Sequence, residues 1–234
     1  ISDEDFYFMR DSMAILEAVN LKESKVVDVK MTKLTLPGHN DEYGKSTVFT
    51  TREAGIYNDV IPDKAFYGKK SLYYFTFPEK IIQIGDRAFN QTSISGSLVI
   101  PDDVTHIWDF AFYQTNISSL VLGPNVTIVG PGAFADCASL SGTLNLPETI
   151  TYLGYEVFSD CGFSGQLILP NSLKYIGYSA FQDAGDFKGG LSIPENIQTL
   201  YDKTFYSNFY NAFTGILKLR NVSKIGAACF HKCR

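Results

Sequence analysis

One short motif returns along most of the chain and sets its organisation. A small residue followed by phenylalanine, as in IPDKAF, IGDRAF and IGYSAF, occurs eight times in one frame at intervals of 22 to 25 residues. This spacing is too regular for chance in a chain that has 18 phenylalanines, and self-similarity at such a period is typical of solenoids. The repeated residues are Phe66, Phe89, Phe112, Phe134, Phe158, Phe181, Phe205 and Phe230.

Prolines form a second column with the same period. Each closes a short apolar alternation such as LVIP, LNLP or LSIP, at Pro78, Pro101, Pro124, Pro147, Pro170 and Pro194. The alternation is strand-like. Proline lacks an amide donor and can end a strand at a corner, and the glycine after the next isoleucine permits another corner. The alanine-phenylalanine segment predicts a short helical or 3₁₀ turn whose ring points into the coil.

A unit of this size cannot bury its apolar face alone, so neighbouring units must stack and share one core. The pattern L-x-I-P-x-x-(V/I/L)-x-x-I-G-x-x-A-F-x-x-C/T resembles the BspA-type leucine-rich repeat over roughly residues 60–234. Trp108 and Tyr201 depart from its glycine column. The predicted fold is therefore a β-rich α/β repeat protein, a leucine-rich-repeat solenoid with about seven to eight coils of roughly 23 residues and short turns.

The first 59 residues depart from the repeat and are interpreted as an N-terminal cap, a first atypical repeat and a long loop, continuous with the solenoid at 60–234. Residues 3–20 indicate a short helix, followed by a strand at 16–21. Strand-like alternation returns at 27–31 and 34–37. Residues 37–59 are interpreted as a long loop inserted in the first repeat, and a loop of that length is often functional.

No catalytic or cofactor motif is present. His39, His106 and His231 lie far apart in different columns, and the sequence has no phosphate loop, nucleophile elbow or H-E-x-x-H motif. We therefore expect no enzyme activity, cofactor or metal; a hidden hydrolase in the 37–59 loop is the alternative. A net charge of −5 argues against nucleic acid, and no run of 18 apolar residues predicts membrane insertion.

The cysteines have a structural explanation. Cys137, Cys161 and Cys233 fall three residues after the repeated phenylalanine, in a column of mostly small residues. Side chains in neighbouring coils run parallel, which disfavours a bond between Cys137 and Cys161. We expect free, buried thiols, and a disulfide, with Cys229 and Cys233 as the pair concerned, is the alternative.

Alternation also predicts a surface. The apolar residues of each L-x-I enter the core, so the residues between them face outward on one sheet. This sheet face is small, polar and nearly uncharged, and it is a candidate surface for a protein or glycan. Its members are Tyr74, Thr76, Ser97, Val99, Ser119, Val121, Thr143, Asn145, Gln166, Ile168, Gly190, Ser192, Ile216 and Lys218.

A second candidate is an aromatic stripe on the next side of the coil. Aromatic rings with a polar tip are favoured at binding interfaces. The candidate ligand-binding residues are Trp108, Tyr152, Tyr155, Tyr175, Tyr178 and Tyr201, with His106 beside them. The alternative is a stacked ladder that only covers the coils.

The resemblance implies a noncatalytic binding or adhesion module, exported to a bacterial surface. The implied partners are host matrix or cell-surface proteins, or surface glycans. The alternative function is a structural spacer or assembly element that has no ligand of its own.

Overall fold

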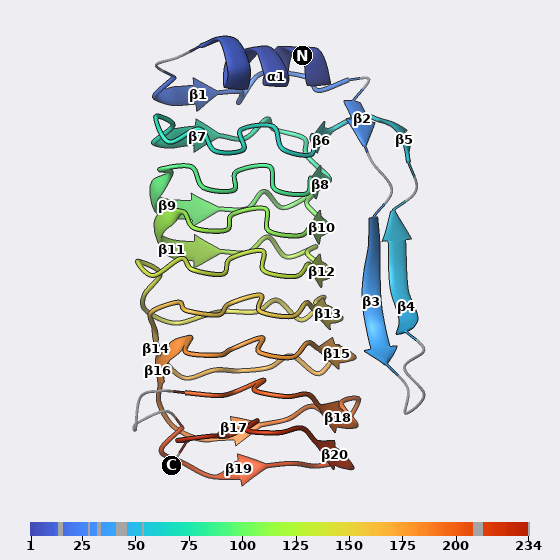
Figure 1. The fold of residues 1–234 in the computed structure, drawn as a ribbon, viewed down its shortest axis with the longest axis vertical. Helices are drawn as coiled ribbons and strands as arrows, with labels where there is room; N and C mark the ends of the chain where they lie inside the picture. The colour runs from blue at the N-terminus through green and yellow to red at the C-terminus, as the bar shows by residue number, and fades with distance from the viewer. Residues whose placement is uncertain are drawn as a thin grey trace.

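The computed structural model is a stack of coils with a helix across its first end (Figure 1). It describes residues 1–13, 16–27, 29–31, 34–40, 46–52, 54–207 and 213–233. About seven turns of roughly 23 residues form a solenoid that is rich in strands and poor in helix, and this confirms the predicted fold class. The two termini lie near opposite ends of the stack.

The first side of the stack is built from the L-x-I segments. Its strands are β1 (Ala18–Asn20), β7 (Tyr74–Thr76), β9 (Ser95–Val99), β11 (Asn116–Val121), β17 (Leu191–Ser192) and β19 (Leu217–Lys218). They pair in parallel as β1–β7, β9–β11 and β17–β19, and a bridge joins Asn145 to Ile168. Parallel pairing in register keeps equivalent residues of successive coils side by side.

The second side carries a longer parallel sheet. Its six strands are β6 (Val60–Ile61), β8 (Gln83–Ile84), β10 (His106–Ile107), β12 (Ile128–Val129), β13 (Tyr152–Leu153) and β15 (Tyr175–Ile176). The sheet ends at β15, and β18 (Thr199–Leu200) pairs with β20 (Lys224–Ile225) in a separate two-stranded sheet. A further pair joins β14 (Phe163–Gly165) to β16 (Gly185–Phe187) in parallel.

The glycine column exists because neighbouring coils approach closely at that corner. A Cβ atom on Gly154 would lie 2.2 Å from the Pro131 nitrogen, and one on Gly177 would lie 2.3 Å from the Tyr155 nitrogen. Only a residue without a side chain fits there without moving backbone.

The repeated phenylalanines form the centre of the core. Phe89, Phe112, Phe134 and Phe158 stack with ring centroids 5.1 to 5.6 Å apart and interplanar angles of 8° or less. At the first end, Phe6 of helix α1 (Asp3–Ser12) packs edge-on against Phe66. The helix begins after Ser2, whose amide donates to the Asp5 carboxylate at 2.7 Å. The cap therefore closes the same column that the repeats build.

The region after the cap corrects one prediction. The interpretation of residues 37–59 as a long loop is wrong where the structure describes them, because most of these residues belong to antiparallel strands. β2 (Val29–Met31) pairs with β5 (Gly55–Tyr57), and β3 (Leu34–Asn40) pairs with β4 (Ser46–Arg52). We call these two strand pairs, β2–β5 and β3–β4, the arm. It runs along the side of the stack that carries the six-stranded sheet (Figure 1). The division of the chain at residue 59 stays a prediction.

Removing one ring from the stacked column should destabilise the whole solenoid. Phe134→Ala should lower the free energy of unfolding by about 3–5 kcal/mol, because it leaves a cavity between Phe112 and Phe158. Urea unfolding followed by circular dichroism measures the change. Phe8→Ala is the matched control, since that ring is exposed on α1 and its loss should have little effect. An equal loss of unfolding free energy in the two variants would contradict a special contribution of the stacked rings to stability.

Candidate functional site

The sheet face predicted from alternation is exposed as expected. Tyr74, Val99 and Ile168 expose 67%, 57% and 62% of their surfaces, and the other proposed members are exposed or half-buried. The flanking residues Leu98 and Ile100 point inward and are buried. This difference follows from the two-residue period of a strand, and it leaves apolar side chains on a flat outer surface. Whether a partner binds there stays a prediction.

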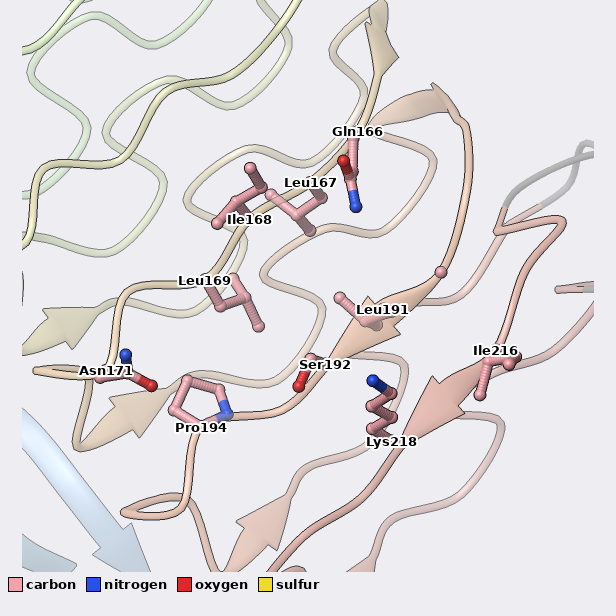
Figure 2. Close-up of a pocket in the computed structure, with 11 residues that line it drawn as sticks. Gln166, Leu167, Ile168, Leu169, Asn171, Leu191, Ser192, Pro194, Ile216 and Lys218 are labelled. Atoms are coloured by element: carbon pink, nitrogen blue, oxygen red, sulfur yellow. The ribbon is translucent and has the colours of Figure 1, made fainter.

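The sheet face is hollowed near the end of the stack by Gly190 and Ser192. A groove of about 470 Å³ lies over them. Figure 2 shows Leu191 and Ser192 in the middle of this groove, between Ile168 on one side and Ile216 with Lys218 on the other. Glycine is required at 190 because a Cβ there would lie 2.6 Å from the Ile216 carbonyl oxygen. The groove therefore has small residues at its floor and apolar ridges at its sides.

The aromatic stripe divides into three parts, of which the first is buried. Trp108 is 2% exposed and Tyr152 is fully buried, and both pack with Ile128 in a small cluster outside the main core. The Trp108 indole donates to the Gln83 side chain at 2.8 Å and stacks on His106. These two residues cannot contact a surface ligand in this conformation, because packing already covers them.

The second part is a stacked pair on the adjoining turn. The rings of Tyr155 and Tyr178 are parallel within 1° and lie 4.9 Å apart, and Tyr178 is exposed. Burial raises the pKa of Tyr155 to about 12. One ring face of each tyrosine packs against the other ring. This is the geometry expected of a stacked ladder that covers the coils.

The third part lines a groove. Tyr175 and Tyr201 are both half-buried, and they lie beside a polar hollow of about 370 Å³. Their rings are 5.4 Å apart and inclined by 45°. Of the six predicted residues, the structure brings Trp108, Tyr152, Tyr175 and Tyr201 onto one side of the stack, and it places Tyr155 and Tyr178 next to each other on another part.

Sequence reasoning missed a charged cluster where the arm meets the solenoid. Arg52, at the end of β4, has a buried guanidinium that forms an ion pair with Asp63 at 2.7 Å and lies 4.9 Å from the Trp108 ring. His106 lies in the same region, and burial together with Arg52 lowers its pKa to about 4. The ion pair and the indole contact link Arg52 of the arm to the first and third copies of the repeated motif.

Within this cluster, Asp109 has the fewest favourable interactions to offset the burial of its carboxyl group. Asp63, Asp86 and Asp109 occupy one column, and the carboxylate of Asp63 accepts the backbone amide of Asp86 at 2.8 Å. The residue that follows Asp109 in this column is Pro131, which has no amide to donate. The Asp109 Oδ1 atom is buried without a hydrogen-bond partner among the described residues. A repeat-by-repeat reading of this column could have found the mismatch.

The cysteines agree with the prediction of free thiols. All four are free, and Cys137, Cys161 and Cys229 are buried. The Cys137 and Cys161 thiols donate to the carbonyls of Phe112 and Phe134, so they satisfy backbone groups of the preceding turn. Among the described residues, no group of three acidic, histidine or cysteine side chains is placed to hold a metal ion.

The coil geometry, the inward phenylalanine column and the sheet of L-x-I strands define a leucine-rich-repeat solenoid. A family model described as the BspA type leucine rich repeat region matches in six copies, over residues 59–188 and 154–234. The chain therefore belongs to the BspA-type leucine-rich-repeat family.

Two solved structures are similar to the chain at low identity. A leucine-rich-repeat protein from T. pallidum is 23% identical with a TM-score of 0.46, covering 74% of this chain and 69% of that one. A leucine-rich-repeat protein from Bacteroides ovatus is 19% identical with a TM-score of 0.47, covering 85% of this chain and 79% of that one. No curated protein matches the sequence.

The unpaired carboxyl predicts an unusual pH dependence of stability. Burial, and then the nearby Asp86 carboxylate, raise the pKa of Asp109 from 3.8 to about 7. The folded protein thus holds this proton more tightly than the unfolded chain. The contribution of Asp109 to stability is complete below pH 3.8 and is lost as the pH rises to about 7.

Asp109→Asn should therefore be more stable than the parent protein at pH 8, by about 1–3 kcal/mol, and the difference should shrink towards pH 4. Urea unfolding at both pH values measures it. Asp202→Asn is the control, because the side-chain oxygen there accepts the Ala227 amide at 2.7 Å and an asparagine oxygen can do the same. An Asp109→Asn gain that is equal at pH 4 and pH 8 would contradict the assignment.

Proposed function

We propose that this protein is a noncatalytic binding or adhesion module that presents its sheet face to a protein partner at a bacterial surface. Membership of the BspA-type family supports a repeat-based interaction module. The specific partner, the adhesive role and the choice of the sheet face belong to the proposal. A leucine-rich-repeat solenoid suits this role because its stacked coils offer one extended surface with equivalent positions at regular spacing.

The observation that carries the proposal is a set of four exposed apolar side chains on the sheet face. Val99, Val121, Ile168 and Ile216 each expose more than half of their surfaces on successive or nearby coils. Val99 and Val121 are direct neighbours on β9 and β11, and exposed apolar side chains that lie together mark interaction sites. Lys218 is the one charged side chain among the fourteen proposed face residues, so little charge must be desolvated when a partner covers them.

The groove over Gly190 and Ser192 gives the proposed surface its anchor point. Binding energy at protein interfaces concentrates where a side chain enters a well-packed hollow. Ile168 and Ile216 form the walls, and the floor has room for an aliphatic or aromatic side chain of the partner. The partner we infer is therefore a protein with an exposed apolar anchor residue.

The surface location rests on the family. BspA-type repeats are typically found in surface-associated bacterial proteins. Among the described residues, the single helix is too short and too polar to cross a bilayer. The competing function is a spacer or assembly element, for which the sheet face would have no ligand of its own.

The test is a binding screen with a sheet-face variant. The purified chain is applied to immobilised host matrix proteins and a glycan array, with heat-denatured protein as the control for nonspecific adsorption. A saturable protein ligand should lose about tenfold or more in affinity with Ile168→Asp, because a charge would have to be buried at the groove wall. Ile56→Asp is the matched control, since Ile56 is equally exposed but lies on β5 in the arm.

Thermal unfolding of each variant checks that the fold is retained. An absence of binding to every immobilised protein would favour the spacer function. Protein binding that Ile168→Asp leaves unchanged would place the interface elsewhere and contradict the proposed surface.

A further inference from the structure

The groove on the sheet face has two halves that differ in chemistry. The first half is apolar, because Ile168 and Ile216 stand on either side of Gly190, which has no side chain. The second half is polar, with Ser192 and Lys218 two residues further along the same two coils. Figure 2 shows both halves in one view. The groove therefore offers an apolar pocket and a cation at a fixed spacing.

Strand register places the two polar side chains together. β17 and β19 pair in parallel with Ser192 directly opposite Lys218. The preceding residue, Leu191, is buried, so the alternation of the strand turns Ser192 outward. Both Ser192 and Lys218 are exposed. A hydroxyl and an ammonium group on neighbouring strands can donate hydrogen bonds to the same carboxylate.

The charge of Lys218 is not neutralised by its surroundings. The next basic residue along the chain, Arg220, forms an ion pair with Glu195 at 2.7 Å. Lys218 has no ion pair within the part of the chain that the structure describes. It also carries the only charge among the described residues that line the groove. A partner's carboxylate would therefore meet a cation here and no competing acid.

Backbone groups on one side of the groove also face away from the next coil. Among the described residues, no strand pair or backbone hydrogen bond joins 166–169 to 190–192. The amides of Leu191 and Ile193 both donate to carbonyls of the following coil. Because alternate amides of a strand point to opposite neighbours, the amide of Ser192 points away from β19. It can donate to the backbone of a segment that lies in the groove, as in β-strand addition.

The spacing of the two halves matches an extended chain. Gly190 and Ser192 are two residues apart, which in a strand corresponds to about 6–7 Å. In an extended peptide, side chains two positions apart point to the same side and have the same separation. A strand-like segment lying along this coil would place one side chain over Gly190 and the next inward-pointing one beside Lys218.

We propose that the groove binds an extended segment of a partner protein in which an apolar residue and an aspartate or glutamate lie two positions apart. The apolar side chain packs between Ile168 and Ile216, and the carboxylate accepts hydrogen bonds from Lys218 and Ser192. This inference rests on the proposed function, because it names the sequence that the sheet face recognises. Lys218 sets the specificity, since it attracts acidic segments and repels basic ones.

The experiment is a selection from a random peptide library displayed on phage, with the full chain immobilised. The enriched peptides should share an acidic residue two positions from an aliphatic or aromatic one. The same selection on Lys218→Glu should enrich lysine or arginine at the acidic position, because the charge of the groove is reversed. Lys174→Glu is the matched control, since Lys174 is equally exposed but lies outside the groove, and it should select the same acidic peptides as the parent protein.

Affinities of one selected peptide, measured by fluorescence anisotropy, quantify the contributions. Lys218→Glu should weaken binding at least about tenfold, and replacing the acid of the peptide by its amide should do the same. Ile168→Asp should also weaken binding at least about tenfold, because it places a charge at the wall of the apolar half. Thermal unfolding checks that each variant keeps the fold.

The outcomes separate this inference from the proposed function. Peptides that lack an acid, and that lose binding with Ile168→Asp but not with Lys218→Glu, would overturn the inference and leave the sheet face as a protein-binding surface. Equal losses with Lys218→Glu and Lys174→Glu would reflect net charge and overturn it too. Peptides that bind Ile168→Asp as well as the parent would count against both. An absence of enriched peptides would overturn the inference alone, since the screen of immobilised proteins decides the proposed function.

Discussion

The structure depends on the stacking of coils, because no single repeat can bury its own apolar face. The phenylalanine column is the physical form of that dependence. Each ring between Phe89 and Phe158 lies flat against its neighbours at 5.1 to 5.6 Å, and each therefore needs a coil on both sides. Helix α1 meets the same need at the first end by placing Phe6 against Phe66. The sequence of the outward-facing residues can vary, because the register of the coils is set by the core and by the glycine corners where neighbouring coils approach closely.

Two grooves lie where the regular stacking of the coils is interrupted. The six-stranded sheet ends at β15, and the neighbouring β18 joins a different sheet. The groove lined by Tyr175 and Tyr201 spans this boundary. On the other side of the same coils, Gly190 removes a side chain from the sheet face and leaves the hollow shown in Figure 2. A fully regular stack would present flat ridges and no anchor for a ligand.

The arm shows a second way in which the repeat is modified. Arg52 brings a charge into the space between Asp63 and Trp108, where the ion pair offsets the cost of burying it. Asp109 lies in the same column of acids, but Pro131 offers it no amide. Each coil can supply hydrogen-bond partners to the next, and at Asp109 that supply fails, while burial and the nearby Asp86 carboxylate raise its pKa.

The sequence by itself determined the period, the inward phenylalanines and the outward residues of the sheet face, since these follow from local alternation repeated at a fixed interval. It did not determine the fate of the aromatic stripe. Trp108 and Tyr152 occupy the same repeat columns as the half-buried Tyr201 and Tyr175, yet they are buried. Nor did it reveal that most of the described residues between 37 and 59 form strands of an arm. Burial and antiparallel pairing depend on segments far apart in the chain, and only the tertiary structure brings those segments together.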